Sequence, residues 1–122
     1  MTMLPESFWL PEPSFAERLA ERRESARRTL RDASYDDLRA LVLELFPDQK
    51  HPFAETISRF IEEHRSERAV RGEVPGHTAF VYYPRAGRGI WYQHHDDRVN
   101  VGLLGETSLK VLSEICAERG RS

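Results

Sequence analysis

The side chains best suited to metal binding or acid–base chemistry lie together between residues 81 and 97. This segment ends in the run His94, His95, Asp96 and Asp97. Histidine and aspartate are good metal ligands and can act as general acids or bases. On a strand, however, His94 and His95 point to opposite faces, and the two aspartates divide in the same way. We expect no cofactor, and we keep a small metal-dependent enzyme with His94, His95 and Asp97 as candidate ligands as the second alternative.

The same segment carries arginines and aromatic residues around a short turn. Arg85 and Arg88 flank the sequence Ala-Gly, and Tyr82 and Trp91 stand on either side of them. The planar guanidinium group suits carboxylates and phosphates. Tryptophan, tyrosine and arginine also dominate the hot spots of protein interfaces. We therefore predict that Tyr82, Arg85, Arg88 and Trp91 form a surface that binds a protein partner.

Alternating residues predict a β-hairpin with strands at 77–83 and 89–95. A two-residue turn at Ala86-Gly87 would place Arg85 opposite Arg88 and Tyr82 opposite Trp91. Antiparallel sheets with one wet face alternate apolar and polar residues, but this hairpin is apolar on both faces. One face must pack on helices. The other is covered from within, by the last helix or by residues 7–10, or it is exposed to a partner or ligand.

The first 13 residues form a proline-rich arm, and residues 14–122 a single α+β domain. Proline disfavours regular helix in the arm. The arm nevertheless contains Phe8 and Trp9, and disordered tails have few aromatic residues. We predict that Phe8 and Trp9 dock either on their own domain or on a partner.

Helical patterns come before the strands. The first predicted helix begins at Ser14, where Ser14 and Glu17 would form a capping box. The second begins at Ser34, again with an acid three residues later, and the third near Pro52. Glycine and proline between residues 72 and 76 predict a turn or linker after the third helix.

The end of the chain adds a strand and a helix to this pattern. Residues 98–104 alternate as a third strand, and Gly105 leads into a last helix with Leu112 and Ile115 facing inward. Helices grouped before strands predict an α+β fold. We expect three N-terminal helices, a three-stranded antiparallel β-meander, and a C-terminal helix packed on the sheet.

Composition limits the classes of function and the cellular location. The chain has 122 residues, which is the length of one domain, and a formal net charge of −2. Dedicated nucleic-acid binders usually carry a strong positive excess. Cys116 is the only cysteine, which fits a reducing compartment. The sequence shows neither a signal peptide nor a membrane span, so we expect a cytoplasmic protein that binds no membrane.

These patterns favour a small cytoplasmic, non-catalytic interaction module, a regulator or adaptor that binds a protein partner through the aromatic and arginine-rich hairpin. The first alternative is a nucleic-acid-binding protein that uses the same hairpin, either winged-helix-like or by stacking single strands. A homo-oligomer formed through the N-terminal arm or the hairpin is a further alternative.

Overall fold

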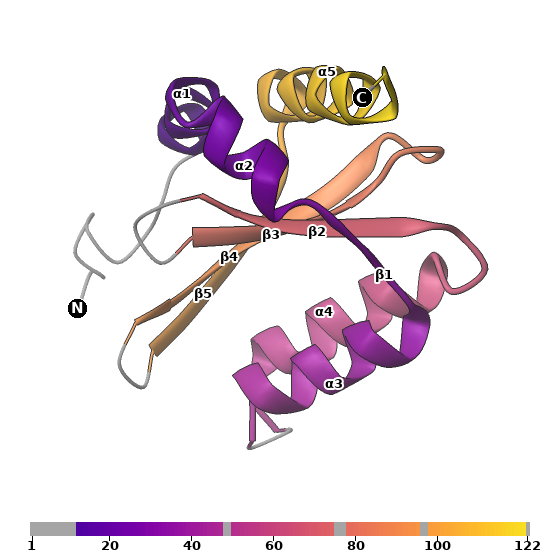
Figure 1. The fold of residues 1–122 in the computed structure, drawn as a ribbon. Helices are drawn as coiled ribbons and strands as arrows, with labels where there is room; N and C mark the ends of the chain where they lie inside the picture. Colours follow the sequence, from indigo (N-terminus) through magenta and orange to yellow (C-terminus); the bar gives the residue numbers. More distant parts are fainter. Residues whose placement is uncertain (1–11, 48–49, 75–77, 96–97, 122) are drawn as a thin grey trace.

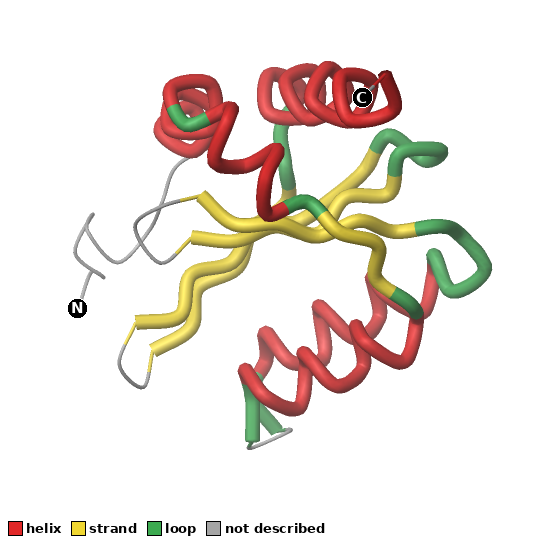
Figure 2. The backbone as a smooth tube through the Cα atoms, in the orientation of Figure 1, coloured by secondary structure: helices red, strands yellow, loops and turns green. Residues whose placement is uncertain are grey.

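An antiparallel β-sheet separates two layers of helices in the computed structural model, which describes residues 12–47, 50–74, 78–95 and 98–121 (Figure 1 and Figure 2). The strands lie side by side in chain order and are β1 (Arg31–Ala33), β2 (Ala69–Val74), β3 (Thr78–Tyr83), β4 (Arg88–His95) and β5 (Arg98–Leu103). The helices are α1 (Glu12–Glu21), α2 (Arg23–Thr29), α3 (Tyr35–Leu45), α4 (Pro52–Glu63) and α5 (Glu106–Arg121). In Figure 1, α1, α2 and α5 lie above the sheet, and α3 and α4 lie below it. The α+β class is confirmed, but the predicted numbers of strands and N-terminal helices are wrong.

The first predicted helix is divided and begins earlier than expected. Helix α1 begins at Glu12, so Ser14 lies inside the helix and the predicted capping box at Ser14 is wrong. Pro13 is tolerated because the first turn of a helix needs no backbone N–H. At Arg22 the backbone turns to φ −110° and ψ 30°, and α2 follows. The start of α1 also lies within the residues assigned to the N-terminal arm.

The predicted starts of α3 and α4 are confirmed. Ser34 caps α3 because its hydroxyl accepts a hydrogen bond from the Asp37 backbone N–H, while the Asp37 carboxylate accepts one from the Ser34 N–H. These two hydrogen bonds hold the pKa of Asp37 below its usual value. Pro52 occupies the first turn of α4. The caps therefore fix where the lower helices begin relative to the sheet.

The second half of strand β2 falls in the segment 72–76, which was predicted as a turn or linker because of its glycine and proline residues. A Cβ at Gly72 would lie 2.7 Å from the Phe80 ring, so glycine is needed there because the ring fills the space. Val70 and Val74 are buried on either side of Gly72, as expected for a strand within a sheet. Strand β1 extends the sheet beyond β2 through only three residue pairs.

The β3–β4 hairpin is confirmed, but its predicted register is wrong. Tyr83 pairs with Arg88 and Phe80 with Trp91, so the loop contains the four residues 84–87 instead of two. Gly87 adopts φ 62°, which glycine accommodates without strain, and its N–H donates to the Tyr83 carbonyl at 2.9 Å. The shift amounts to two positions, so each side chain keeps the face that the sequence predicted.

Each face of the sheet belongs to its own hydrophobic core. The lower core joins Val81, Tyr83, Ile90 and Tyr92 to the buried residues of α3 and α4. The upper core joins Phe80, Tyr82 and Trp91 to α1, α2 and α5, including Leu112 and Ile115 of the last helix. The second apolar face of the hairpin is therefore covered from within the chain.

Candidate functional site

The structure divides the predicted hairpin surface into buried and exposed members. Tyr82 is 4% exposed and Trp91 5%, so their rings belong to the upper core and offer almost no surface to a partner. Arg85 and Arg88 are exposed. Phe8 and Trp9 lie outside the described residues. The exposed part of the predicted surface on this hairpin is therefore its pair of arginines.

Arg88 is held in place by a chain of polar contacts. Its Nη1 lies 3.2 Å from Nε2 of His64, and Nδ1 of the same imidazole lies 2.6 Å from the Glu67 carboxylate. The Arg88 guanidinium is always protonated, so it is the donor to Nε2, and Nδ1–H then donates to Glu67. Arg88 also lies 3.5 Å from Glu63 and 5.0 Å from the centre of the Phe60 ring. These contacts fix the guanidinium at one end of a groove.

That groove, which we call the α4–β5 groove, runs between helix α4 and strands β4 and β5. It has a volume of about 350 Å³. Its lining is mostly apolar and includes Phe53, Ile57 and Phe60 from α4 and Val101 and Leu103 from β5. Leu103 is 63% exposed, although it lies beside a hydrophobic core. The groove therefore presents unfilled apolar surface at the edge of the sheet.

Strand β5 is the last of the described strands on this side of the sheet, and its hydrogen-bonding pattern turns the backbone groups of every second residue outward. The Leu104 N–H donates to the Gly89 carbonyl at 2.9 Å, which continues the β4–β5 register. In an antiparallel pair, residues that bond across the pair alternate with residues that do not. The N–H and C=O groups of Val99, Val101 and Leu103 therefore point away from β4. Among the described strands, none lies beyond them.

The two edges of the sheet differ in their protection against further strands. Native proteins protect edges with short strands, charged side chains and proline. Strand β1 is three residues long and carries exposed Arg31 and Asp32. Strand β5 is six residues long, and after Arg98 it continues as Val-Asn-Val-Gly-Leu without a charge or a proline. The β5 edge lacks the protection that β1 has.

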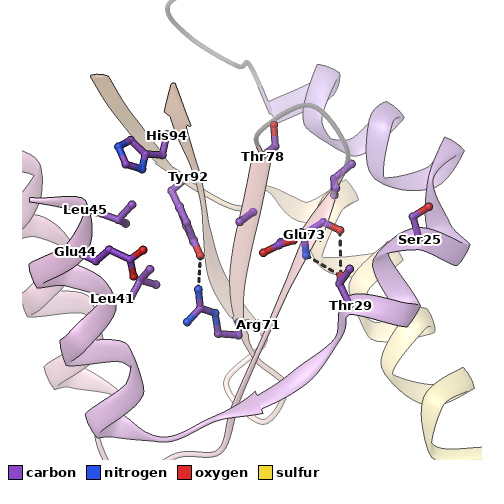
Figure 3. Close-up of a pocket in the computed structure, with 12 residues that line it drawn as sticks. Ser25, Thr29, Leu41, Glu44, Leu45, Arg71, Glu73, Thr78, Tyr92 and His94 are labelled. Carbon is purple, nitrogen blue, oxygen red and sulfur yellow. Dashed lines mark hydrogen bonds between the residues drawn. The ribbon is translucent and has the colours of Figure 1, made fainter. Parts of the chain in front are cut away.

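A second cavity, which we call the Arg71 pocket, lies on the same sheet face beside α3 (Figure 3). It has a volume of about 470 Å³, and its lining includes Leu41, Glu44, Arg71, Tyr92 and His94. Nη2 of Arg71 donates to the Tyr92 hydroxyl at 3.1 Å. Burial raises the pKa of Tyr92 above its ordinary value, so this hydroxyl stays protonated at neutral pH.

The histidine and aspartate run is only partly described. His94 is exposed and lines the Arg71 pocket. Asp96 and Asp97 lie outside the described residues, as does the side chain of His95. Within the described part of the chain, no three histidine, cysteine, aspartate or glutamate residues are grouped as metal ligands would be.

Two arginines of helix α2 form ion pairs with carboxylates. Arg23 forms ion pairs with Glu114, at 3.1 Å, and with Glu118 of α5. Arg27 lies 2.6 Å from Glu24, and the hydrogen bond between them holds the pKa of Glu24 below its usual value. The Arg23 ion pairs join α2 to α5, and all three contacts offset part of the positive charge that nucleic-acid binding would need.

Sequence reasoning missed the α4–β5 groove and the Arg71 pocket. Both are formed by side chains from separate elements, and only the alternation of Val99, Val101 and Leu103 gave a local signal.

Comparison with protein-family models, curated proteins and solved structures finds no match for this chain. None of the helices in the described residues has the length and apolar character to span a membrane.

Proposed function

We propose that the protein is a small cytoplasmic, non-catalytic regulator or adaptor that binds an extended segment of a protein partner along strand β5. The partner segment adds a strand to the sheet and places every second side chain in the α4–β5 groove. The observation that carries the proposal is the outward-facing β5 edge, which has no charged residue after Arg98, beside that apolar groove.

Strand addition suits this edge because the backbone supplies affinity and the groove supplies selectivity. The N–H and C=O groups of Val99, Val101 and Leu103 point outward and can pair with an incoming strand. Because side chains alternate along a strand, every second partner residue would face α4. The apolar lining favours aliphatic or aromatic residues at those positions.

Arg88 supplies a polar contact at one end of the groove. The guanidinium has five N–H donors, and its contacts with His64 and Glu63 leave others available. Its position is fixed before binding, which lowers the entropy lost when a partner is bound. We expect the partner segment to present a carbonyl or carboxylate oxygen to Arg88. Arg88 was predicted as a partner-binding residue, and it keeps that role in this proposal.

The test is affinity capture from native cells with three variants of the full chain. Leu103→Ser removes the exposed apolar wall of the groove. Val101→Pro removes an outward N–H, and proline is tolerated on an edge strand where its nitrogen faces solvent. Leu43→Ser is the matched control, because Leu43 is also exposed, at 52%, but lies on α3. Circular dichroism and thermal melting establish that each variant is folded.

The expected result is a partner retained by wild type and Leu43→Ser and lost by Leu103→Ser and Val101→Pro. Retention of every partner by the two β5 variants would contradict the proposal. Light scattering tests a second copy of this chain as the occupant. A dimer that Val101→Pro converts to a monomer would replace the separate partner with another copy at the same edge.

A further inference from the structure

The Arg71 pocket carries an inference beyond the proposed function. It lies beside α3, whereas the α4–β5 groove lies beside α4, and the two have different linings. Its volume of about 470 Å³ is in the range of small-molecule sites. Its apolar walls include Leu41, Leu45 and Ala79, and its polar groups converge from β2, β4 and α3 (Figure 3).

The central polar group is Arg71, a half-buried arginine that attracts the Asp37 carboxylate at longer range without an ion-pair contact. Other arginines, such as Arg59 and Arg68, lie 2.8 and 3.0 Å from a carboxylate. Arg71 forms no ion pair with any described residue, and its hydrogen bond goes to the neutral Tyr92 hydroxyl. Partial burial of a charge is costly unless an opposite charge compensates it. An anion bound in direct contact with the guanidinium would add to that compensation.

Tyr92 extends the same anion site. Its hydroxyl accepts from Arg71, so its own proton is free for donation. A carboxylate bound to the guanidinium can therefore accept a second hydrogen bond from Tyr92. Carboxylate and guanidinium match in geometry through two parallel N–H···O bonds. Together, Arg71 on β2 and Tyr92 on β4 offer donors on one sheet face, where their side chains meet across β3.

Two carboxylates add the opposite charge to the pocket. Glu44 lies on α3 and Glu73 on β2, and both line the cavity. In Figure 3 they flank Tyr92 from opposite sides. Their negative charge favours a cationic group on the ligand and disfavours a polyanion. The ligand that satisfies both ends is small, carries one carboxylate and one ammonium group, and has an apolar body.

We propose that the Arg71 pocket binds a small zwitterion of the amino-acid type. Its carboxylate lies against Arg71 and Tyr92, its ammonium group faces Glu44 or Glu73, and its side chain contacts Leu41 and Leu45.

The test is a titration of the full chain with free L-amino acids, followed by ¹H–¹⁵N NMR, including the Arg71 Nε–Hε signal. The comparison probes are sodium acetate, the N-acetyl amino acids and the amino-acid amides. The variants are Tyr92→Phe, which keeps the core ring, Arg71→Gln, and Glu44→Gln combined with Glu73→Gln. Arg68→Gln is the matched control, because it removes an equal charge outside the pocket.

We expect at least one amino acid to bind saturably with Kd below about 1 mM and to shift Arg71 and Ala79. The N-acetyl and amide forms of that amino acid should each bind about ten-fold more weakly or worse. Binding of the amino acid itself should be weakened about ten-fold or more by Tyr92→Phe, by Arg71→Gln and by the double glutamate variant, and it should not be weakened by Arg68→Gln. Absence of saturable binding by every amino acid would overturn the proposal. Equal binding by acetate or the N-acetyl forms would also overturn it, because the ammonium group would then play no part.

Discussion

Leu103 and Ile90 stand opposite each other on neighbouring strands, yet Leu103 is 63% exposed and Ile90 only 4%. Their side chains share one sheet face, because directly paired residues point the same way. The lower helical layer therefore covers this face at Ile90 and leaves it open at Leu103. A partner strand at β5 would complete the cover over Leu103.

The difference between these two residues predicts different costs of truncation. Ile90→Ala should lower the free energy of unfolding by about 2–5 kcal/mol, because it leaves a cavity in the lower core. Leu103→Ala should change it by no more than about 0.5 kcal/mol, as for an exposed residue. Urea denaturation of both variants measures the two values. Equal losses would mean that Leu103 is covered within the free protein.

Gly102 should tolerate no side chain, because it lies against Trp91. A Cβ at Gly102 would come within 2.6 Å of two carbons of the indole ring. The indole is buried in the upper core and has little room to shift. Gly102→Ala should therefore cost about 1–3 kcal/mol of stability by urea denaturation. Leu103→Ala, one residue away, is the control, and a Gly102→Ala protein as stable as wild type would refute this packing.

Tyr83 should make the free energy of unfolding depend on pH in the alkaline range. Burial, together with the nearby Glu67 carboxylate, raises the pKa of Tyr83 to about 12, against about 10 in the unfolded chain. Above pH 10 the unfolded state loses this proton before the folded state does, so the free energy of unfolding falls as pH rises toward 12. A difference of two pKa units corresponds to a loss of about 2–3 kcal/mol.

Tyr83→Phe isolates this contribution. The Tyr83 hydroxyl is buried and makes no hydrogen bond to a described residue, so its removal at neutral pH should leave stability equal or slightly higher. Between about pH 9 and pH 11.5 the variant should lose about 2 kcal/mol less than wild type, by urea denaturation at each pH. Parallel losses in the two proteins would show that Tyr83 does not cause the effect.

The sequence was a good guide where local chemistry decides the structure. Ser34 and Asp37 form the predicted cap, and the face of each hairpin side chain follows from simple alternation. The hairpin register was wrong because Pro84 and Arg85 belong to a loop whose geometry the Ala-Gly pair alone did not specify. Strand β2 was missed because glycine in a sequence usually indicates a turn. The reason for Gly72 is the Phe80 ring, which occupies the space that a side chain would need, and this contact is visible only in the structure.

The candidate sites were harder to predict because they depend on tertiary packing. Trp91 and Tyr82 looked like interface residues, but the upper helices supply their cover. Arg88 was singled out for its type alone, and its contacts with His64 and Phe60 require α4 to lie beside β4. Arg71 and Tyr92 meet across β3, a relationship that no local pattern contains.

Hydrogen exchange along β5 tests the proposed strand addition most directly. In the free protein, the outward N–H groups of Val99, Val101 and Leu103 should exchange faster than those of Asn100 and Gly102, which face β4. Addition of the partner retained by wild type and lost by Leu103→Ser should slow exchange at those three outward groups, because they then bond to the added strand. Unchanged exchange at all three in the saturated complex would contradict strand addition at β5.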